Sequence, residues 1–211
     1  AHYPEESMAA LLNSELDDIE RIAFLVNEAK NMEVVILPPD INMSFTTFTP
    51  EGKNKIRFGL LGIKNVGEAI TEAIIQERAL RGPFKSLEDL IMRVDHKDLN
   101  KKSIEAMAKT GVFDSFGLER NAVLGNIEEI LKFHQMIKKS GARTSASLFG
   151  SMMPATPPSL KLAPIEPAKP EDKLKWEKEL LGFYLSEHPL NRYQARIDLA
   201  KAKSLSEMRT L

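Results

Sequence analysis

The stretch RFGLLGIKNVGEAITEAIIQER, from Arg57 to Arg78, decides the fold expected for this chain of 211 residues. Gly62, Lys64 and Gly67 stand directly before apolar residues that recur at three- and four-residue spacing, which predicts a helix after the turn. Two interpretations of the turn GIKNVG compete. It either joins two packed helices, or it binds a phosphate at the start of the second helix.

The phosphate interpretation follows from backbone chemistry. The first N–H groups of a helix lack intrahelical partners, and the partial positive charge there, roughly +0.5, favours an anion. Gly62 and Gly67 permit a positive φ and place no Cβ between the backbone and a phosphate oxygen, while Lys64 adds a full charge. Such contacts reach no base, so binding to double-stranded DNA would be independent of sequence and sensitive to salt. The candidate DNA-binding residues here are Gly62, Ile63, Lys64, Asn65, Val66 and Gly67.

Two features keep the packing turn open as an alternative. Glu68 falls in the first turn of the predicted helix, where its carboxylate would repel a phosphate. Short glycine turns are also common connectors between packed helices.

A second glycine turn, GVFDSFG, runs from Gly111 to Gly117 and is followed by Arg120. Its two phenylalanines are typical of core side chains, so the turn taken alone is better explained by packing. As the partner of the first turn it could bind phosphate, because two adjacent hairpins can hold the backbone on both sides of a minor groove. Gly111, Gly117 and Arg120 therefore join the candidate DNA-binding residues.

Composition excludes several classes of protein. The chain has no cysteine, so disulfides and thiolate chemistry are excluded. It has neither an apolar run near the roughly 20 residues of a membrane span nor an N-terminal signal pattern, and we expect a cytoplasmic protein without a membrane partner. Residues 1–52 hold 2 Lys/Arg and 10 Asp/Glu, whereas residues 53–109 hold 12 and 8. The locally basic middle is compatible with a polyanion partner, although a mixed solvated surface gives similar counts.

The remaining patterns predict a mainly α fold with a small β-hairpin and a tandem helix-hairpin-helix domain. A short strand is expected at Val34–Leu37, and a hairpin is expected from SFTTF and KIRFGL around the turn TPEGKN. Predicted helices cover Asp18–Lys30, the residues after Gly67, the stretch SLEDLIMRV with Ser86 as its cap, Lys101–Lys109, and a stripe of Val123, Ile127, Ile130 and Leu131. Residues 140–172 hold six of the 12 prolines and should run extended over a surface or be disordered. Helical character resumes in KLKWEKELLGFYL, whose Trp176, Leu180, Phe183 and Tyr184 we interpret as core or interdomain packing.

Seven segments occur in an order that carries a family resemblance: AHYPEESMAALL, VVILPPDINMSF, KIRFGLLGIKNVGEAITEAI, GPFKSLEDL, GVFDSFG, SASLFG and ELLGFYLSEHPL. In this order they resemble the alpha subunit of bacterial DNA polymerase III, the C-family replicative polymerase, over essentially the whole chain. Since the chain also begins without methionine, we expect a fragment. The resemblance implies four parts: the end of the fingers domain (1–43), the β-hairpin with the tandem helix-hairpin-helix domain (44–139), a proline-rich linker with a clamp-binding peptide (140–172), and a helical segment leading to a missing oligonucleotide-binding domain (173–211).

By this resemblance the parent protein is a DNA-directed DNA polymerase, a nucleotidyltransferase that uses Mg²⁺, and the fragment itself is not catalytic. The metal-binding aspartates of the family lie in the palm, N-terminal to every residue here. Asp17 and Asp18 are not interpreted as a metal pair, because adjacent helical residues point about 100° apart. The four histidines show no trustworthy metal spacing, so neither a metal site nor a cofactor is expected in this fragment.

The segment TSASLFG occupies the place of the family's clamp-binding peptide, in which a glutamine, two small or polar residues, an aliphatic residue and phenylalanine are typical. The matching residues here are Ser145, Ala146, Ser147, Leu148 and Phe149, with serine at the glutamine position. The resemblance therefore implies the sliding clamp (beta subunit) and other polymerase III holoenzyme subunits as partners. Leu148 and Phe149 could instead fold back onto this domain.

Two other functions remain possible from the sequence. The chain could be a free-standing helix-hairpin-helix module of the repair or recombination type. It could also be a structural adaptor without DNA contact, which the acidic N-terminal segment would suit.

Overall fold

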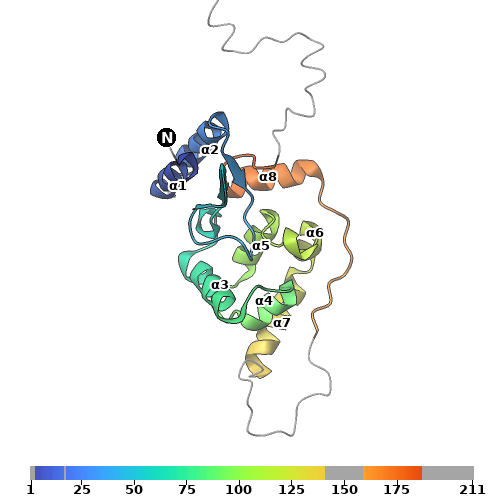
Figure 1. The fold of residues 1–211 in the computed structure, drawn as a ribbon. Coiled ribbons are helices and arrows are strands. Elements are labelled where there is room, and N and C mark those ends of the chain that lie inside the picture. Colours follow the sequence, from blue (N-terminus) through green and yellow to red (C-terminus); the bar gives the residue numbers. More distant parts are fainter. Residues whose placement is uncertain (1–2, 17, 141–158, 187–211) are drawn as a thin grey trace, which may run out of the picture.

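The structure, a computed structural model, describes residues 3–16, 18–140 and 159–186. Helices dominate these ranges and surround one small sheet (Figure 1), which confirms the mainly α fold. The helices are α1 (Pro4–Ser14), α2 (Ile19–Asn31), α3 (Glu68–Arg81), α4 (Leu87–Arg93), α5 (Lys101–Lys109), α6 (Arg120–Gly125), α7 (Ile127–Ser140) and α8 (Pro170–Leu180). Two short 3₁₀ turns, η1 (Leu60–Gly62) and η2 (Asp114–Phe116), precede α3 and α6.

The sheet has three strands in the order β1-β3-β2, made of β1 (Val35–Leu37), β2 (Thr49–Pro50) and β3 (Lys55–Arg57). β2 and β3 form the predicted antiparallel hairpin, and β1 adds a parallel strand that was not predicted to join it. The prediction that the first hairpin strand covers residues 44–48 was wrong, because this stretch follows directly on a turn that side chains stabilise. Asp40 accepts from the N–H groups of Asn42 and Met43, and Ser44 donates to the carbonyl of Phe58.

Two helices at the N-terminal end cover the sheet. α1 was not predicted, although Pro4 stands in its first turn and its Met8, Ala9 and Leu12 are buried. α2 is the predicted helix, and the Asp18 carboxylate caps it by accepting from the N–H groups of Glu20 and Arg21. Asp18 is therefore a helix cap.

The helices α3 to α7 and the sheet share one hydrophobic core. The helix predicted through Val123 and Leu131 is divided into α6 and α7, because Asn126 interrupts it. The Asn126 amide bonds the carbonyl of Ala122 within α6 and also both backbone groups of Ala163. Its side chain thus serves a distant segment of the chain.

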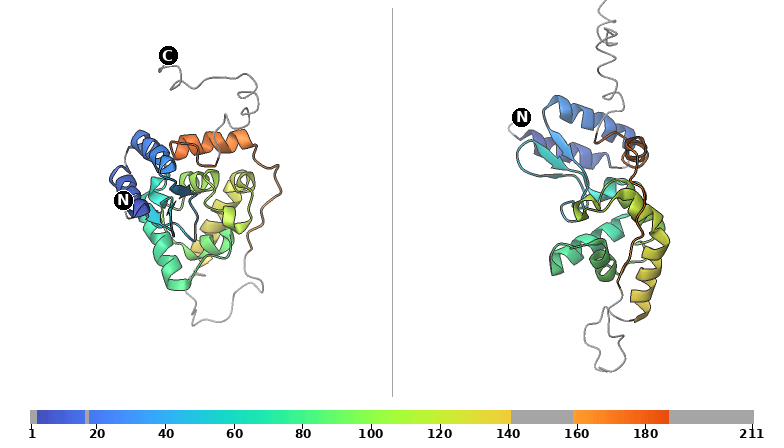
Figure 2. Two further views of the ribbon diagram at one scale, coloured as in Figure 1. Left: turned by 45° about the horizontal axis from the view of Figure 1, so that its top comes forward. Right: turned by 90° about the vertical axis from the view of Figure 1, so that its right-hand side faces the viewer.

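That segment, residues 159–169, runs extended beside α6 and α7 (Figure 2) and is called the strap below. Besides the Asn126 bonds, the N–H of Leu160 donates to Glu88, and the N–H of Ala168 donates to Glu119. This part of the proline-rich segment therefore lies over a surface, one of the two predicted outcomes. α8 then starts at Pro170, three positions earlier than predicted. Proline suits this position, because the N–H that it lacks would have no intrahelical acceptor in the first turn of a helix.

Candidate nucleic-acid interface

The turn GIKNVG connects η1 to α3 and presents polar residues between two buried anchors. Ile63 and Val66 are 1% and 4% exposed, while Lys64 and Asn65 between them are exposed. The N–H of Ile63 donates to the carbonyl of Leu60, and the N–H of Val66 donates to the carbonyl of Ile63. The turn is thus held from inside and offers Lys64 to solvent.

Neither glycine of this turn uses the positive φ that glycine permits. Asn65, with φ of 71°, is the residue with a positive φ in the turn, and Gly67 has φ of −84°. A Cβ on Gly62 would lie 2.9 Å from the Phe58 ring, so Gly62 is required by packing. A Cβ on Gly67 would meet nothing within 4 Å. In this turn tertiary packing accounts for Gly62, and an asparagine supplies the positive φ.

Gly67 leaves the N-terminus of α3 without a side-chain cap. The N–H groups of the first turn therefore keep their capacity to bond an acceptor. Gly67, Glu68 and Ala69 are exposed, as is Lys64. Thr71 does not compete, since its hydroxyl is buried and donates back to the carbonyl of Gly67. This end of α3 carries the features that favour an anion, with the Glu68 carboxylate opposing them.

The second turn is built differently. Gly111 and Gly117 have positive φ values of 83° and 70°. Arg120 is only 11% exposed and donates to the Asp114 carboxylate at 2.8 Å and to the carbonyl of Lys109 at 2.9 Å. A Cβ on Gly111 would collide with the Arg120 guanidinium. Arg120 thus closes the end of α5, which favours a packing role over the predicted phosphate contact.

Comparisons with known proteins match this architecture. A family model described as "Helix-hairpin-helix motif" matches residues 33–123, which contain both turns. "DNA polymerase III subunit alpha" of Thermus aquaticus is 37% identical over 98% of this chain and 17% of that protein. The proteins of the same name from Chlamydia trachomatis and Borreliella burgdorferi are 38% and 37% identical over 90% and 94% of this chain. The chain is homologous to a segment of DNA polymerase III subunit alpha.

The resemblance inferred from the sequence is therefore confirmed. The chain spans about one sixth of the length of these curated relatives, covering 16 or 17% of each.

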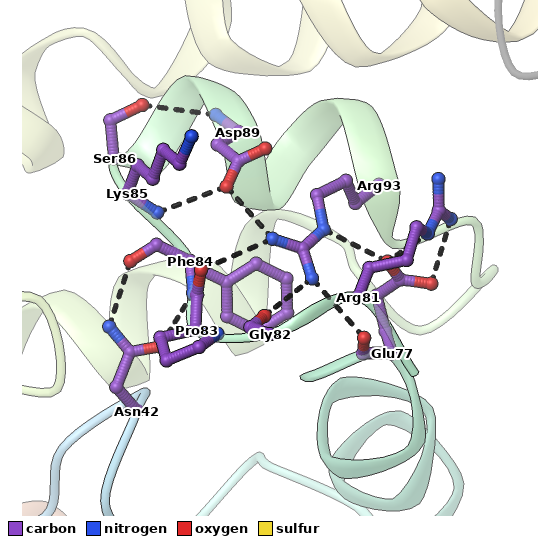
Figure 3. A network of polar contacts seen from close by, with 10 residues as sticks. All are labelled: Asn42, Glu77, Arg81, Gly82, Pro83, Phe84, Lys85, Ser86, Asp89 and Arg93. Carbon is purple, nitrogen blue, oxygen red and sulfur yellow. Dashed lines mark hydrogen bonds and ion pairs between the residues drawn. The ribbon is translucent and has the colours of Figure 1, made fainter. Parts of the chain in front are cut away.

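In this chain, the far end of α3 is fixed by Arg93 of α4 (Figure 3). The guanidinium donates to the carboxylate of Glu77 at 2.9 Å, to the carbonyl of Gly82 at 2.7 Å and to the carboxylate of Asp89 at 2.9 Å. Burial raises the pKa of Glu77, but hydrogen bonds from Arg81 and Arg93 outweigh it and hold that pKa below its usual range. Glu77 is thus kept as a carboxylate that orients Arg93.

Neither this network nor two asparagine contacts were predicted from the sequence. The amide of Asn42 bonds both backbone groups of Phe84, as the amide of Asn13 does with Phe48. Asp89 and Arg93, four residues apart on one helix, were a readable signal for an ion pair. Nothing local in the sequence announces the distant partners of the asparagines.

Several predicted residues lie outside the part of the chain that the structure describes. They include the whole clamp-binding candidate, Ser145, Ala146, Ser147, Leu148 and Phe149. Within the described ranges, no three His, Asp or Glu side chains are grouped so that they could hold a metal ion. No helix in those ranges is both long and apolar enough to cross a bilayer.

Proposed function

We propose that this chain is the duplex-holding segment of a replicative DNA polymerase. We also propose that the turn GIKNVG, called the first turn below, binds the DNA backbone. The observation that carries the proposal is the exposed, uncapped N-terminus of α3 beside Lys64, in a chain homologous to DNA polymerase III subunit alpha. The whole protein would be a DNA-directed DNA polymerase. Its Mg²⁺ ions would be held by palm carboxylates outside this segment, and its partners would include other holoenzyme subunits.

A phosphate at this turn would accept from the N–H groups at the start of α3 and pair with the Lys64 ammonium. Backbone donors and an alkyl ammonium distinguish no base, so the contact holds DNA without reading its sequence. Glu68 reduces the local positive potential, which would keep the contact weak enough for the duplex to slide. The second turn would add little charge, because Asp114 neutralises Arg120.

The test is a fluorescence-anisotropy titration of the chain with a short duplex across a salt series. Lys64→Glu should weaken binding at low salt and reduce the slope of log K against log salt by about 1, as expected for one lost phosphate contact. Lys132→Glu on α7 is the matched control, since Lys132 is 70% exposed on its side chain and forms a surface ion pair with neighbouring Glu129. Equal losses in both variants, or no binding by the unaltered chain at low salt, would reject the first turn as a DNA site.

We also propose that residues 145–149 tether the polymerase to its sliding clamp. Leu148 and Phe149 are large apolar residues in a polar, proline-flanked stretch. Burying each in a partner pocket could contribute roughly 1.5 to 3 kcal/mol before the ordering cost of the segment. Replacing both residues by alanine should weaken binding to the isolated clamp, whereas unchanged affinity would refute the tether. The free-standing repair module is disfavoured, because the polymerase relatives match 90 to 98% of the chain.

A further inference from the structure

We propose that α8 is a positioning element for the first turn, so that the DNA-holding unit includes residues 168–183 beyond the helix-hairpin-helix match at 33–123. This inference rests on the proposed function of the first turn. It concerns a helix that is separated from α7 by 29 residues of sequence and for which the sequence predicts only a packing role.

The C-terminal end of α8 contacts the first turn directly. The N–H of Lys64 donates to the carbonyl of Leu180 at 3.0 Å. Leu180 is the last residue of α8, and its carbonyl lacks an intrahelical donor. The bond therefore satisfies a free helix acceptor and fixes the backbone of the residue that carries the exposed ammonium.

A second contact, between Phe183 and Phe58, supports the same turn from the core side. Phe183 is 6% exposed, and its ring centroid lies 6.0 Å from that of Phe58. Phe58 is the ring against which Gly62 closes, with no room for a Cβ between them. Phe183 thus backs the packing surface on which η1 and the turn rest.

The N-terminal end of α8 is attached to the start of α6, two residues after the second turn. Lys173 pairs with Glu119 at 2.7 Å, and the same carboxylate accepts from the N–H of Ala168. Glu119 also caps α6. Figure 1 shows α8 extending from beside α6 toward the sheet. α8 therefore joins the two turns at its two ends, and a rigid helix of 11 residues sets their separation.

The test measures amide exchange of Lys64 by NMR in the 211-residue chain, with the amides of Ile70 and Ile74 as internal references for global opening. Phe183→Leu should speed Lys64 exchange about tenfold relative to the references, since it removes the ring contact and leaves an apolar side chain. Glu119→Gln keeps an oxygen for the cap of α6 and loses the charge paired with Lys173. It should speed Lys64 exchange about two- to fivefold.

Glu129→Gln is the control, because Glu129 makes an exposed pair with Lys132 on α7, away from α8. It should leave Lys64 exchange unchanged. Both test variants should also lower the affinity for duplex DNA, and Lys173→Arg, which keeps the charge, should behave as the unaltered chain.

Lys64 exchange that does not respond to Phe183→Leu or Glu119→Gln, or that changes only together with Ile70 and Ile74, would overturn the proposal. If the unaltered chain binds no DNA, the proposed function fails, and the exchange ratios still decide whether α8 positions the turn.

Discussion

Replacing Arg93 by methionine tests whether the Arg93 network holds α3 in place. Methionine keeps an unbranched apolar stem and removes all the donors of the guanidinium. In the structure these donors bond the side chains of Glu77 and Asp89, the carbonyls of Glu77 and Gly82, and more weakly the carbonyl of Pro83. The guanidinium carbon also lies 4.4 Å from the centroid of the Phe84 ring.

The size of the loss follows from burial. The side chains of Arg93 and Glu77 are 11% and 12% exposed, so solvent screens them little, and removing one partner of a buried pair costs about 3 to 5 kcal/mol. Glu77 keeps a second partner in Arg81, at 2.6 Å, which lowers the cost of the remaining carboxylate. Hydrogen bonds to a charged group contribute about 1.5 to 3 kcal/mol each and are not additive. We expect Arg93→Met to lower the free energy of unfolding by about 3 kcal/mol.

Urea denaturation followed by circular dichroism measures this loss, provided that the m-value stays unchanged. Arg81→Met is the matched control, because Arg81 is 53% exposed and its pair with Glu77 should contribute less than about 1 kcal/mol. A double-mutant cycle with Glu77→Gln should show coupling to Arg93. A loss below about 1 kcal/mol for Arg93→Met, or no coupling in the cycle, would refute the reasoning.

Three further predictions concern the turns and the strap. Gly67→Ser should cap α3 and raise the free energy of unfolding, measured in urea melts, by a few tenths of a kcal/mol. The same change should weaken DNA binding in the anisotropy assay, because the serine hydroxyl would accept from an N–H group that is otherwise open to a phosphate. Asn126→Leu should cost about 1 to 3 kcal/mol in the same melts, since both backbone groups of Ala163 lose their partner. Burial raises the pKa of Glu119, but hydrogen bonds from Lys173 and from two backbone N–H groups outweigh burial and hold that pKa below its usual range. Its stabilisation should therefore be present above the usual glutamate pKa and disappear as the pH falls through the lowered value. The stability gap between the unaltered chain and Glu119→Gln, measured in urea melts, should close over that same fall in pH.

Local patterns in the sequence predicted the elements whose burial is periodic. The spacing of Ile22, Val26 and Ala29 gave α2, and the run through Ile104 and Met107 gave α5, because one face of each helix is buried. The missed α1 carries the same kind of signal in Met8 and Leu12. The apolar spacing that indicates a helix is therefore present in α1.

Other features depend on partners far away in the chain. The pairing of β1 with β3 joins Ile36 to Ile56 across a turn-rich stretch, and no periodicity within three residues can announce it. The place of the strap depends on Asn126, whose amide imitates a peptide group for Ala163. The role of Gly62 depends on the Phe58 ring. In each case the decisive contact is tertiary, so the residue type alone left its role open.

The helix starts provide the strongest contrast in the candidate site. Among the residues that the structure describes, four helices begin with a side chain that bonds their first N–H groups. These caps are Asp18, Ser86, Asn100 and Glu119. α1 and α8 begin with proline in the first turn, which removes a donor instead. α3 begins at Glu68 with neither device, and a Cβ on the preceding Gly67 would meet nothing within 4 Å. Space therefore does not forbid a capping serine or asparagine at Gly67. A helix that leaves its first N–H groups open at an exposed turn beside Lys64 gives up stabilisation that a bound phosphate would restore.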